Sequence, residues 1–287
     1  MSEVSREYKD RLFTFIFNQE EHKDWTLCLY NAMNGSRYEN PDDIKITTIK
    51  DVIYLGMHND VSFIIANQLN LYEQQSSYNP NMPLRLLQYT ANLFDSYVKD
   101  NKLRKHGSKL LQLPAPKFAV FYNGVKDVPE KTILKLSDSF PEGVQADIEV
   151  TVLMLNINYG KSRDLLDACQ PLMEYSWIVN EIRKRSKTAG IKEAVDSVIN
   201  ELPRSFVLRP FLVKHKVEVG DMLLTEYNKE YEDELNREEA WEEGRAEGML
   251  STLIKLVTEK LISITDAAKQ LNLSEADFIK RMEAAKA

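Results

Sequence analysis

Cysteine, glycine and proline are all scarce in this sequence, whose 287 residues include 2 Cys, 10 Gly and 10 Pro. The two cysteines, Cys28 and Cys169, stand in apolar stretches, with no second Cys or His at the spacing of a metal site. We expect two buried free thiols, and we expect neither a disulfide nor a zinc site. With so little glycine and proline, the composition is unlike that of a disordered chain.

Long apolar runs are also missing. No segment approaches the roughly 20 apolar residues that a membrane-spanning helix needs. Residues 1–13 carry charges where a signal peptide has its apolar stretch. The sequence therefore predicts a protein that stays in the cytosol and has no membrane partner.

The net charge of −7 is unusual for a protein that binds nucleic acid, but the acidic residues are unevenly placed. The segment from Glu218 to Gly248 contains 12 of the 44 acidic residues but only 3 of the 37 basic residues. The remaining sequence therefore has 34 basic and 32 acidic residues. The rest of the chain is close to neutral. Its charge therefore neither excludes nor indicates DNA as a partner.

The pattern of apolar residues predicts an α/β fold, in a chain long enough for one large domain and a small appendage. We expect a broken helix over 8–34 and strands over 45–49, 51–65, 68–75, 117–124 and 148–159. Helices are expected from Pro83 to about Lys99, over 162–202, and from Gly220 to about Met249.

The helix expected from Pro83 to Lys99 has two distinct faces. Its apolar stripe is formed by Leu84, Leu87, Ala91, Phe94 and Val98. The second face carries Arg85, Gln88, Tyr89 and Asn92 at helical spacing. Because this second face is polar, it could look into a functional site.

Two carboxylates, Asp60 and Glu73, lie on neighbouring expected strands. If Ala66 and Asn67 form a two-residue hairpin turn, the residues that face each other have numbers that add up to 133, which pairs Asp60 with Glu73. Such a pair has Cβ atoms roughly 4.5 to 5.5 Å apart, close enough for both side chains to bind one divalent ion. Gln75 points to the same side of the sheet, whereas a slip of one residue would separate the two carboxylates.

The C-terminal part is expected to be helical and to divide into two pieces. Residues 218–249 form an acidic helical connector, and a break at the GRAEG sequence separates it from a small helical module of residues 250–287. Thr265 with Asp266, and Ser274 with Asp277, are typical of helix N-caps. Apolar positions that could support a homo-oligomer are Leu223, Leu224, Tyr227, Tyr231, Leu235 and Trp241.

Three segments together carry a family resemblance: NDVSFII, LNLYEQQSSYNPNMPLRLLQY and LPAPKFAVFYNG. They resemble the Rpn family of recombination-promoting nucleases and transposases, which belongs to the PD-(D/E)XK nuclease-like superfamily. The resemblance covers about residues 8–159. It implies a restriction-endonuclease-like mixed sheet flanked by helices, within a nuclease-like domain of residues 1–217, and a small all-α C-terminal tail.

The resemblance also implies a chemistry, that of an Mg²⁺- or Mn²⁺-dependent DNA endonuclease in the cytoplasm of a bacterium. Asp60 takes the Asp position of the motif, Glu73 takes the Glu of the E-x-K element, and Gln75 stands where that element most often has Lys. The two carboxylates and the backbone carbonyl of Gln74 would hold the ion. Arg85 and Tyr89 would then contact phosphate.

Other interpretations fit the same residues. Since Gln75 carries no charge, the chain could be a weakened relative that binds nucleic acid without cutting it. It could also be an interaction protein that assembles partners through the acidic helix and the C-terminal helices. His58, on the face of Asp60, is more typical of a structural histidine than of a proton carrier.

Overall fold

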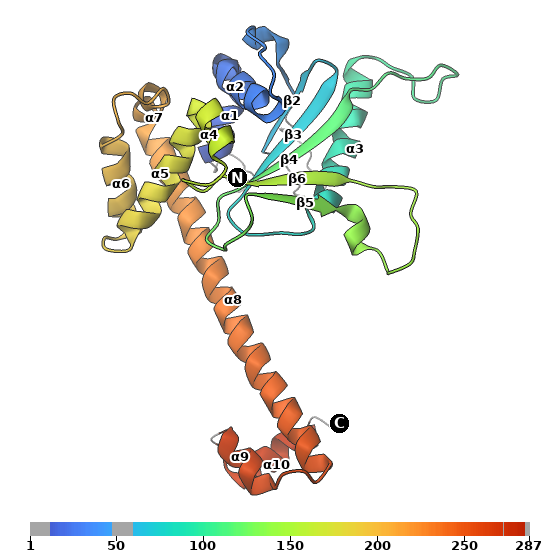
Figure 1. The fold of residues 1–287 in the computed structure, drawn as a ribbon, viewed down its shortest axis with the longest axis vertical. Helices are drawn as coiled ribbons and strands as arrows, with labels where there is room; N and C mark the ends of the chain where they lie inside the picture. Colours follow the sequence, from blue (N-terminus) through green and yellow to red (C-terminus); the bar gives the residue numbers. More distant parts are fainter. Residues whose placement is uncertain (1–11, 48–59, 272, 285–287) are drawn as a thin grey trace, which may run out of the picture. The chain divides into compact units, whose positions relative to one another are not determined.

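The computed structural model describes residues 12–47, 60–271 and 273–284 (Figure 1). Within these residues, six strands form one mixed sheet in the order β1-β2-β3-β4-β6-β5. The strands are β1 (Lys45–Ile46), β2 (Val61–Ile65), β3 (Gln68–Gln75), β4 (Ala115–Tyr122), β5 (Lys131–Lys135) and β6 (Thr151–Asn156). The central pairs β3–β4 and β4–β6 are parallel, and the other pairs are antiparallel.

Most of the strands lie where the sequence predicts them. The strand over 68–75 is confirmed residue for residue, and β4 and β6 confirm those expected over 117–124 and 148–159 within a few residues. Part of the strand expected over 51–65 lies outside the described residues. The edge strand β5 was not predicted. It has only five residues, three of them polar, and its pairing with β6 holds it in the sheet.

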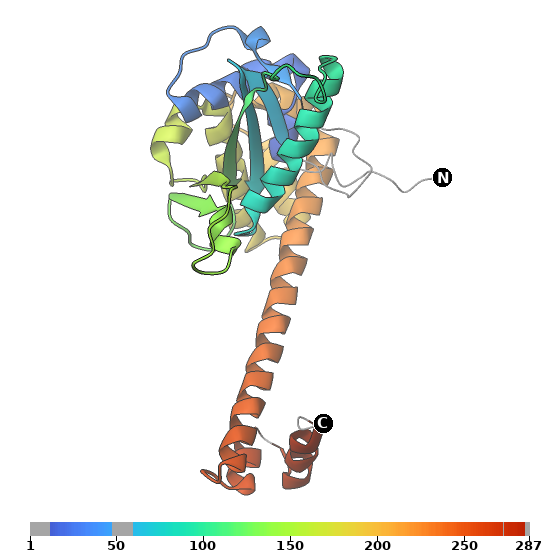
Figure 2. The same ribbon diagram turned by 90° about the vertical axis from the view of Figure 1, so that its right-hand side faces the viewer.

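Helices cover both faces of the sheet (Figures 1 and 2). On one face lie α1 (Leu12–Phe17), α2 (Lys23–Asn34), α4 (Arg163–Ala168), α5 (Gln170–Ser186), α6 (Ile191–Asn200) and α7 (Arg209–Lys214). On the other face lies α3 (Met82–Asp100). Short 3-10 helices occur at Glu20–His22, Pro41–Asp43 and Leu136–Ser139. The first of these separates α1 from α2 and confirms the broken helix.

Two apolar clusters hold these layers together, one on each side of the sheet. The larger joins α1, α2 and α5 to residues such as Phe63, Tyr72 and Phe121, and the smaller joins α3 to residues such as Leu71 and Val120. Because neighbouring residues of a strand point to opposite faces, each central strand contributes to both clusters. The predicted α/β fold, with a mixed sheet flanked by helices, is confirmed at this level.

Helix α3 presents a different face to the sheet from the one predicted. Its buried side chains are Met82, Pro83, Leu86, Tyr89, Thr90 and Leu93, whereas Leu84 and Ala91 are exposed and Leu87, Phe94 and Val98 are half-buried. The predicted apolar stripe is therefore wrong for Leu84 and Ala91, whereas Leu87 and Phe94 pack against the border of the buried cluster. The sequence has two apolar stripes about 100° apart around this helix, and the sheet selects the one that contains Leu86 and Leu93.

The chain divides into two compact units, residues 1–227 and 228–287. Helix α8 spans Lys216–Thr258 and passes through Gly244 and Gly248, so the break predicted at the GRAEG sequence is wrong. Each glycine costs a helix only about 1 kcal/mol, and the flanking residues Glu, Arg, Ala, Met and Leu are good helix formers. The three-part division at residues 217 and 249 stays a prediction.

Part of α8 belongs to the core of the first unit. Leu223 is fully buried, Leu224 and Tyr227 pack against the same cluster, and the Tyr227 hydroxyl donates to the carbonyl of Val179 at 2.9 Å. Leu223 is therefore taken up by the core of this unit. An oligomer that uses Leu224 and Tyr227, which are only partly buried, stays a prediction, and the side chains of Tyr231 and Leu235 lie outside the described residues. Trp241 is exposed, and an oligomer built on it stays a prediction.

The second unit contains the end of α8, α9 (Ile264–Gln270) and α10 (Glu275–Ala284) around Leu253, Ala267, Ala268 and Phe278. Ser274 accepts a hydrogen bond from the Asp277 N–H at 3.1 Å, which confirms it as an N-cap. Ser263, not Thr265, caps α9 through the Asp266 N–H at 3.0 Å. In the described part of the chain, no helix combines the length and the apolar character needed to cross a membrane.

Candidate functional site

A two-residue turn sets the register of the β2–β3 hairpin. Ala66 and Asn67 have φ angles of 49° and 59°, the left-handed conformation that a tight hairpin turn with right-handed strand twist requires. Ser62 pairs with Leu71, and Ile64 pairs with Leu69. The predicted register is thus confirmed, and Asp60, which directly precedes β2, lies at the level of Glu73.

Asp60 and Glu73 are held together by reciprocal hydrogen bonds to the main chain. The backbone N–H of Asp60 donates to Oε1 of Glu73 at 3.0 Å, and the backbone N–H of Gln74 donates to Oδ2 of Asp60 at 2.7 Å. Such charge-assisted bonds fix both side chains and offset part of the repulsion between two neighbouring carboxylates. The hairpin therefore brings the two carboxylates together and anchors each of them to the main chain of the other strand.

The acidic side chain of Glu73 is almost completely buried. Only 2% of its side chain is exposed, on the face of the sheet that α3 covers. A buried carboxylate needs compensation from donors or opposite charge. Here the Asp60 N–H supplies one donor, and a guanidinium nitrogen of Arg85 lies 3.8 Å from Oε2.

Arg85 and Tyr89 form a pair on α3 above the two carboxylates. The guanidinium of Arg85 donates to the Tyr89 hydroxyl at 3.0 Å and lies 5.8 Å from the centre of the Tyr89 ring. Burial opposes the charge on Arg85, but the bond to Tyr89 and the negative charges of Glu73 and Asp60 raise its pKa, so it stays cationic. Burial, together with the charge of Glu73, raises the pKa of Tyr89, so its hydroxyl stays protonated near neutral pH.

Gln75 lies two residues beyond Glu73 on the same face and is buried. Its Nε2 donates to the sulfur of Met82 at 2.6 Å. Its Oε1 is buried and accepts no hydrogen bond from any other described residue. An unsatisfied buried acceptor costs about 1–3 kcal/mol, so this oxygen is suited to a donor such as water.

The structure thus brings together five of the residues predicted for the site: Asp60, Glu73, Gln75, Arg85 and Tyr89. The backbone of Gln74 is also there, because its N–H contacts Asp60. His58 lies outside the described residues. Among those residues, no three His, Cys, Asp or Glu side chains cluster in a way that could hold a metal ion.

A buried polar network behind Glu73 was not predicted. The side chain of Gln74 points to the opposite face of the sheet and donates to Asn123 Oδ1 at 2.7 Å, and Asn123 Nδ2 donates to the Tyr175 hydroxyl at 2.9 Å. Arg183 of α5 donates to the backbone carbonyl of Asn123. An Asn-Gly pair after a strand is typical of a turn, and it has no feature that marks a buried amide.

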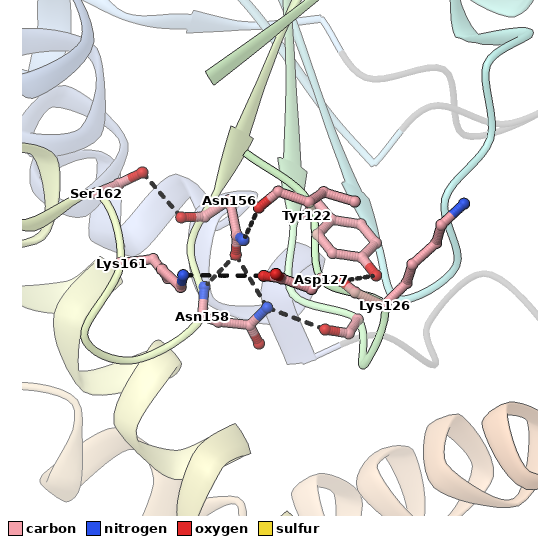
Figure 3. Close-up of polar contacts among 9 residues, drawn as sticks. Tyr122, Lys126, Asp127, Asn156, Asn158, Lys161 and Ser162 are labelled. Atoms are coloured by element: carbon pink, nitrogen blue, oxygen red, sulfur yellow. Dashed lines mark hydrogen bonds and ion pairs between the residues drawn. The ribbon is translucent and has the colours of Figure 1, made fainter. Parts of the chain in front are cut away.

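The network continues at the ends of β4 and β6 (Figure 3). Asn158 donates to the carbonyl of Gly124 and to Asn156 Oδ1, both at 2.9 Å, and Asn156 Nδ2 donates to the Val128 carbonyl at 2.9 Å. Ser162 donates to the carbonyl of Asn156 at 2.8 Å. These bonds satisfy carbonyls that the sheet leaves open and fix the chain where β4 and β6 end.

Gly124 is required where the chain leaves β4, and replacing it is expected to disturb this end of the sheet. A Cβ at this position would lie 1.8 Å from the backbone oxygen of Ser76, which follows β3. Gly124→Ala is therefore expected to lower the free energy of unfolding by about 1–3 kcal/mol. Urea unfolding of the variant beside the wild type measures this loss.

Gly248 provides the matched control. It lies within α8, and a Cβ there would meet no atom within 4 Å. Gly248→Ala is expected to leave stability unchanged or to raise it by about 0.5–1 kcal/mol. Equal effects of the two substitutions would contradict the close approach at Gly124.

No family model matches this chain, and no curated protein and no solved structure matches it significantly. The resemblance to the Rpn family therefore stays a prediction from the sequence.

Proposed function

We propose that this chain is a metal-dependent nuclease with a PD-(D/E)XK core that hydrolyses phosphodiester bonds of DNA. The observation that carries the proposal is the pairing of Asp60 with Glu73 across the hairpin, beside the cation of Arg85. Two carboxylates and a positive charge on one side of a sheet are the groups that a metal-assisted phosphodiesterase needs.

The order of the central elements supports the proposal. An antiparallel hairpin, β2–β3, carries the carboxylates, helix α3 follows, and β4 then returns parallel to β3. This arrangement is compatible with a mixed nuclease-like sheet. Because many unrelated activities share α/β folds, the residues of the site, and not the fold, have to support the function.

The side chains present fit Mg²⁺ or Mn²⁺. Both ions prefer oxygen ligands, and Mg²⁺ keeps several waters when it is bound through one or two carboxylates. Asp60, Glu73 and the backbone carbonyl of Gln74 would hold the ion, and the unsatisfied Oε1 of Gln75 is an additional oxygen on the same face. When bound, the ion would polarise a phosphoryl oxygen and lower the pKa of a bound water.

The chain's own residues would then act on the substrate and on water. Oε1 of Gln75 can accept a hydrogen bond and so orient a water molecule. Arg85 can offset the charge of a phosphate, since 38% of its side chain is exposed and its contact with Glu73 is long. Tyr89 is buried and would hold the guanidinium in place.

Incubation of the purified protein with supercoiled plasmid tests this proposal. We expect nicked circles with Mg²⁺ or Mn²⁺ and none with EDTA. Folded protein that leaves the plasmid intact with both metals would contradict the proposal.

A second candidate function is binding of nucleic acid without cleavage. It is favoured by Gln75, which is uncharged and donates to Met82 at a position where the resemblance leads one to expect a lysine. Such a protein would bind DNA in Ca²⁺ and in Mg²⁺ and nick it in neither. Absence of DNA affinity at low salt would contradict this second function.

Both functions require Arg85 to contact phosphate. Arg85→Gln is therefore expected to weaken DNA binding about tenfold, because a charged hydrogen bond is lost. The slope of log affinity against log salt should fall by about 1, as for the loss of one phosphate contact. Fluorescence-anisotropy titrations at several salt concentrations measure both quantities.

Lys99→Gln is the control for this experiment, because it removes the same charge from the exposed end of α3. It should leave affinity and salt slope near their wild-type values. If both variants weaken binding equally, the effect reflects overall charge and not a contact made by Arg85.

A further inference from the structure

The only two cysteines of the sequence meet in the folded chain, although they lie far apart in the sequence. Cys28 lies on α2, and Cys169 lies between the last residue of α4 and the first residue of α5. Helix α2 packs against both α4 and α5, so this corner brings the two side chains together. Both thiols are free, as predicted, but Cys28 is half-buried and not fully buried.

The two cysteines are neighbours in the folded chain. Cys28 packs against the apolar cluster that contains Cys169, and each thiol affects the pKa of the other. The Cys28 thiol also lies 3.9 Å from the carbonyl of Ala168, the residue before Cys169. No disulfide was expected, because the two cysteines are not close together in the sequence. The spacing of cysteines in a sequence cannot reveal that two distant segments come together in the fold.

The two thiols have different surroundings. The nearby Cys169 thiol lowers the pKa of Cys28 to about 7, against the opposing effect of burial. The Gln170 N–H at the start of α5 lowers it further, whereas Asp24 on α2 raises it. Burial raises the pKa of Cys169, with smaller contributions from Cys28 and the carboxylate of Glu174. Tyr72 of β3 belongs to the same apolar cluster as Cys169.

Cys28 therefore has the features of a reactive thiol and Cys169 those of a protected one. A nucleophilic cysteine is partly accessible and its thiolate is stabilised by donors, whereas a buried thiol is inert until a reactive sulfur lies next to it. This difference in reactivity between the two cysteines is independent of the proposed nuclease site, because no residue of that site affects the pKa of either thiol.

We propose that Cys28 and Cys169 form a redox-modification site for a hydroperoxide. The Cys28 thiolate attacks one peroxide oxygen, the O–O bond breaks, and Cys28 becomes a sulfenic acid while the other oxygen leaves as hydroxide. The Cys169 thiol then attacks the sulfur of Cys28, a disulfide forms, and water leaves with the proton. In total, two thiols lose two electrons and two protons, and one hydrogen peroxide becomes two waters.

The wild-type protein allows a direct test with hydrogen peroxide, because every thiol belongs to this pair. After treatment and removal of the peroxide, titration under denaturing conditions should find no free thiols. Intact mass should show a monomer lighter by two hydrogen atoms, and dithiothreitol should restore both thiols. Retention of both thiols, oxygen added to Cys28 without a disulfide, or dimers linked through Cys28 would each overturn the proposal.

Two single variants assign the roles, with folding verified by circular dichroism. In Cys169→Ser, peroxide should convert Cys28 to sulfenic or higher acids at close to the wild-type rate of thiol loss. In Cys28→Ser, Cys169 should keep its thiol, because it is buried. Fast oxidation of Cys169 in the absence of Cys28 would contradict the assigned order.

The pH dependence of alkylation gives a second, independent measurement. The rate of Cys28 alkylation by iodoacetamide should rise to half its maximum near pH 7, because only the thiolate reacts. In Cys169→Ala the donor is lost, the thiolate is less stable, and the midpoint should move up toward the ordinary value of about 8.5. A wild-type midpoint already near 8.5, or no shift in the variant, would refute the role of Cys169 as a donor.

Discussion

Replacing Glu73 by Gln, or Asp60 by Asn, is expected to abolish the nicking of supercoiled DNA by this protein. A bound cation contributes several kcal/mol to the transition state, so losing one of its carboxylates should slow cleavage roughly 100-fold or more. The amide variants are preferable to alanine, because their oxygens can still accept from the N–H groups of Asp60 and Gln74. Initial rates of conversion of supercoiled plasmid to nicked circles, at a fixed Mg²⁺ concentration, measure the effect.

Glu149→Gln is the matched control. Glu149 is a carboxylate that also accepts main-chain N–H groups, from Ser137 and Val150, but it is exposed and lies in the segment just before β6. It should nick like the wild type. Thermal unfolding of all three variants separates a loss of chemistry from a loss of fold. Full activity in both the Glu73 and the Asp60 variants would mean that these carboxylates only brace the hairpin.

Leu86→Ala is expected to cause the largest loss of stability, about 2–5 kcal/mol in the free energy of unfolding. Leu86 is fully buried between α3 and the sheet, in the cluster that contains Leu71 and Tyr89. Removing its side chain leaves a cavity that neighbouring groups fill only in part. Urea unfolding followed by tryptophan fluorescence reports on the first unit, where two of the three tryptophans, Trp25 and Trp177, lie.

Leu84→Ala makes the same chemical change on the same helix and should cost no more than about 0.5 kcal/mol. Leu84 is 48% exposed, so little apolar surface is lost from the core. The pair of variants measures which face of α3 packs on the sheet. A larger loss for Leu84→Ala than for Leu86→Ala would mean that the helix packs on the stripe predicted from the sequence.

Local patterns of the sequence determined the hairpin and the carboxylate pair. Alternation in 68–75 defines β3, and a turn of two residues fixes the register, so the pairing of Asp60 with Glu73 follows from counting along the chain. The bounds of α3 follow in the same way from Pro83, which is suited to a first helical turn. Such features depend only on residues that are close together in the sequence, so they can be predicted from the sequence alone.

The rotation of α3 depended on its surroundings. Two apolar stripes compete along that helix, and the sheet beneath it buries the one with Leu86 and Leu93. This choice also directs Arg85 and Tyr89 toward Glu73. Two residues of the predicted polar face, Arg85 and Tyr89, thus lie near Glu73, whereas Gln88 is exposed. That this face looks into a functional site stays a prediction.

The sequence by itself determined the central strands and helix α3, which side of the hairpin carries Asp60 and Glu73, and that both cysteines are free. Only the tertiary structure decided that α8 continues through Gly244 and Gly248, that Asn123 is buried against Gln74, and that Cys28 lies beside the segment that carries Cys169. The physical reason is the distance along the sequence over which the deciding interactions act. Secondary structure and register follow from interactions over a few residues, whereas helix rotation, buried amides and thiol contacts depend on packing between segments far apart in the chain.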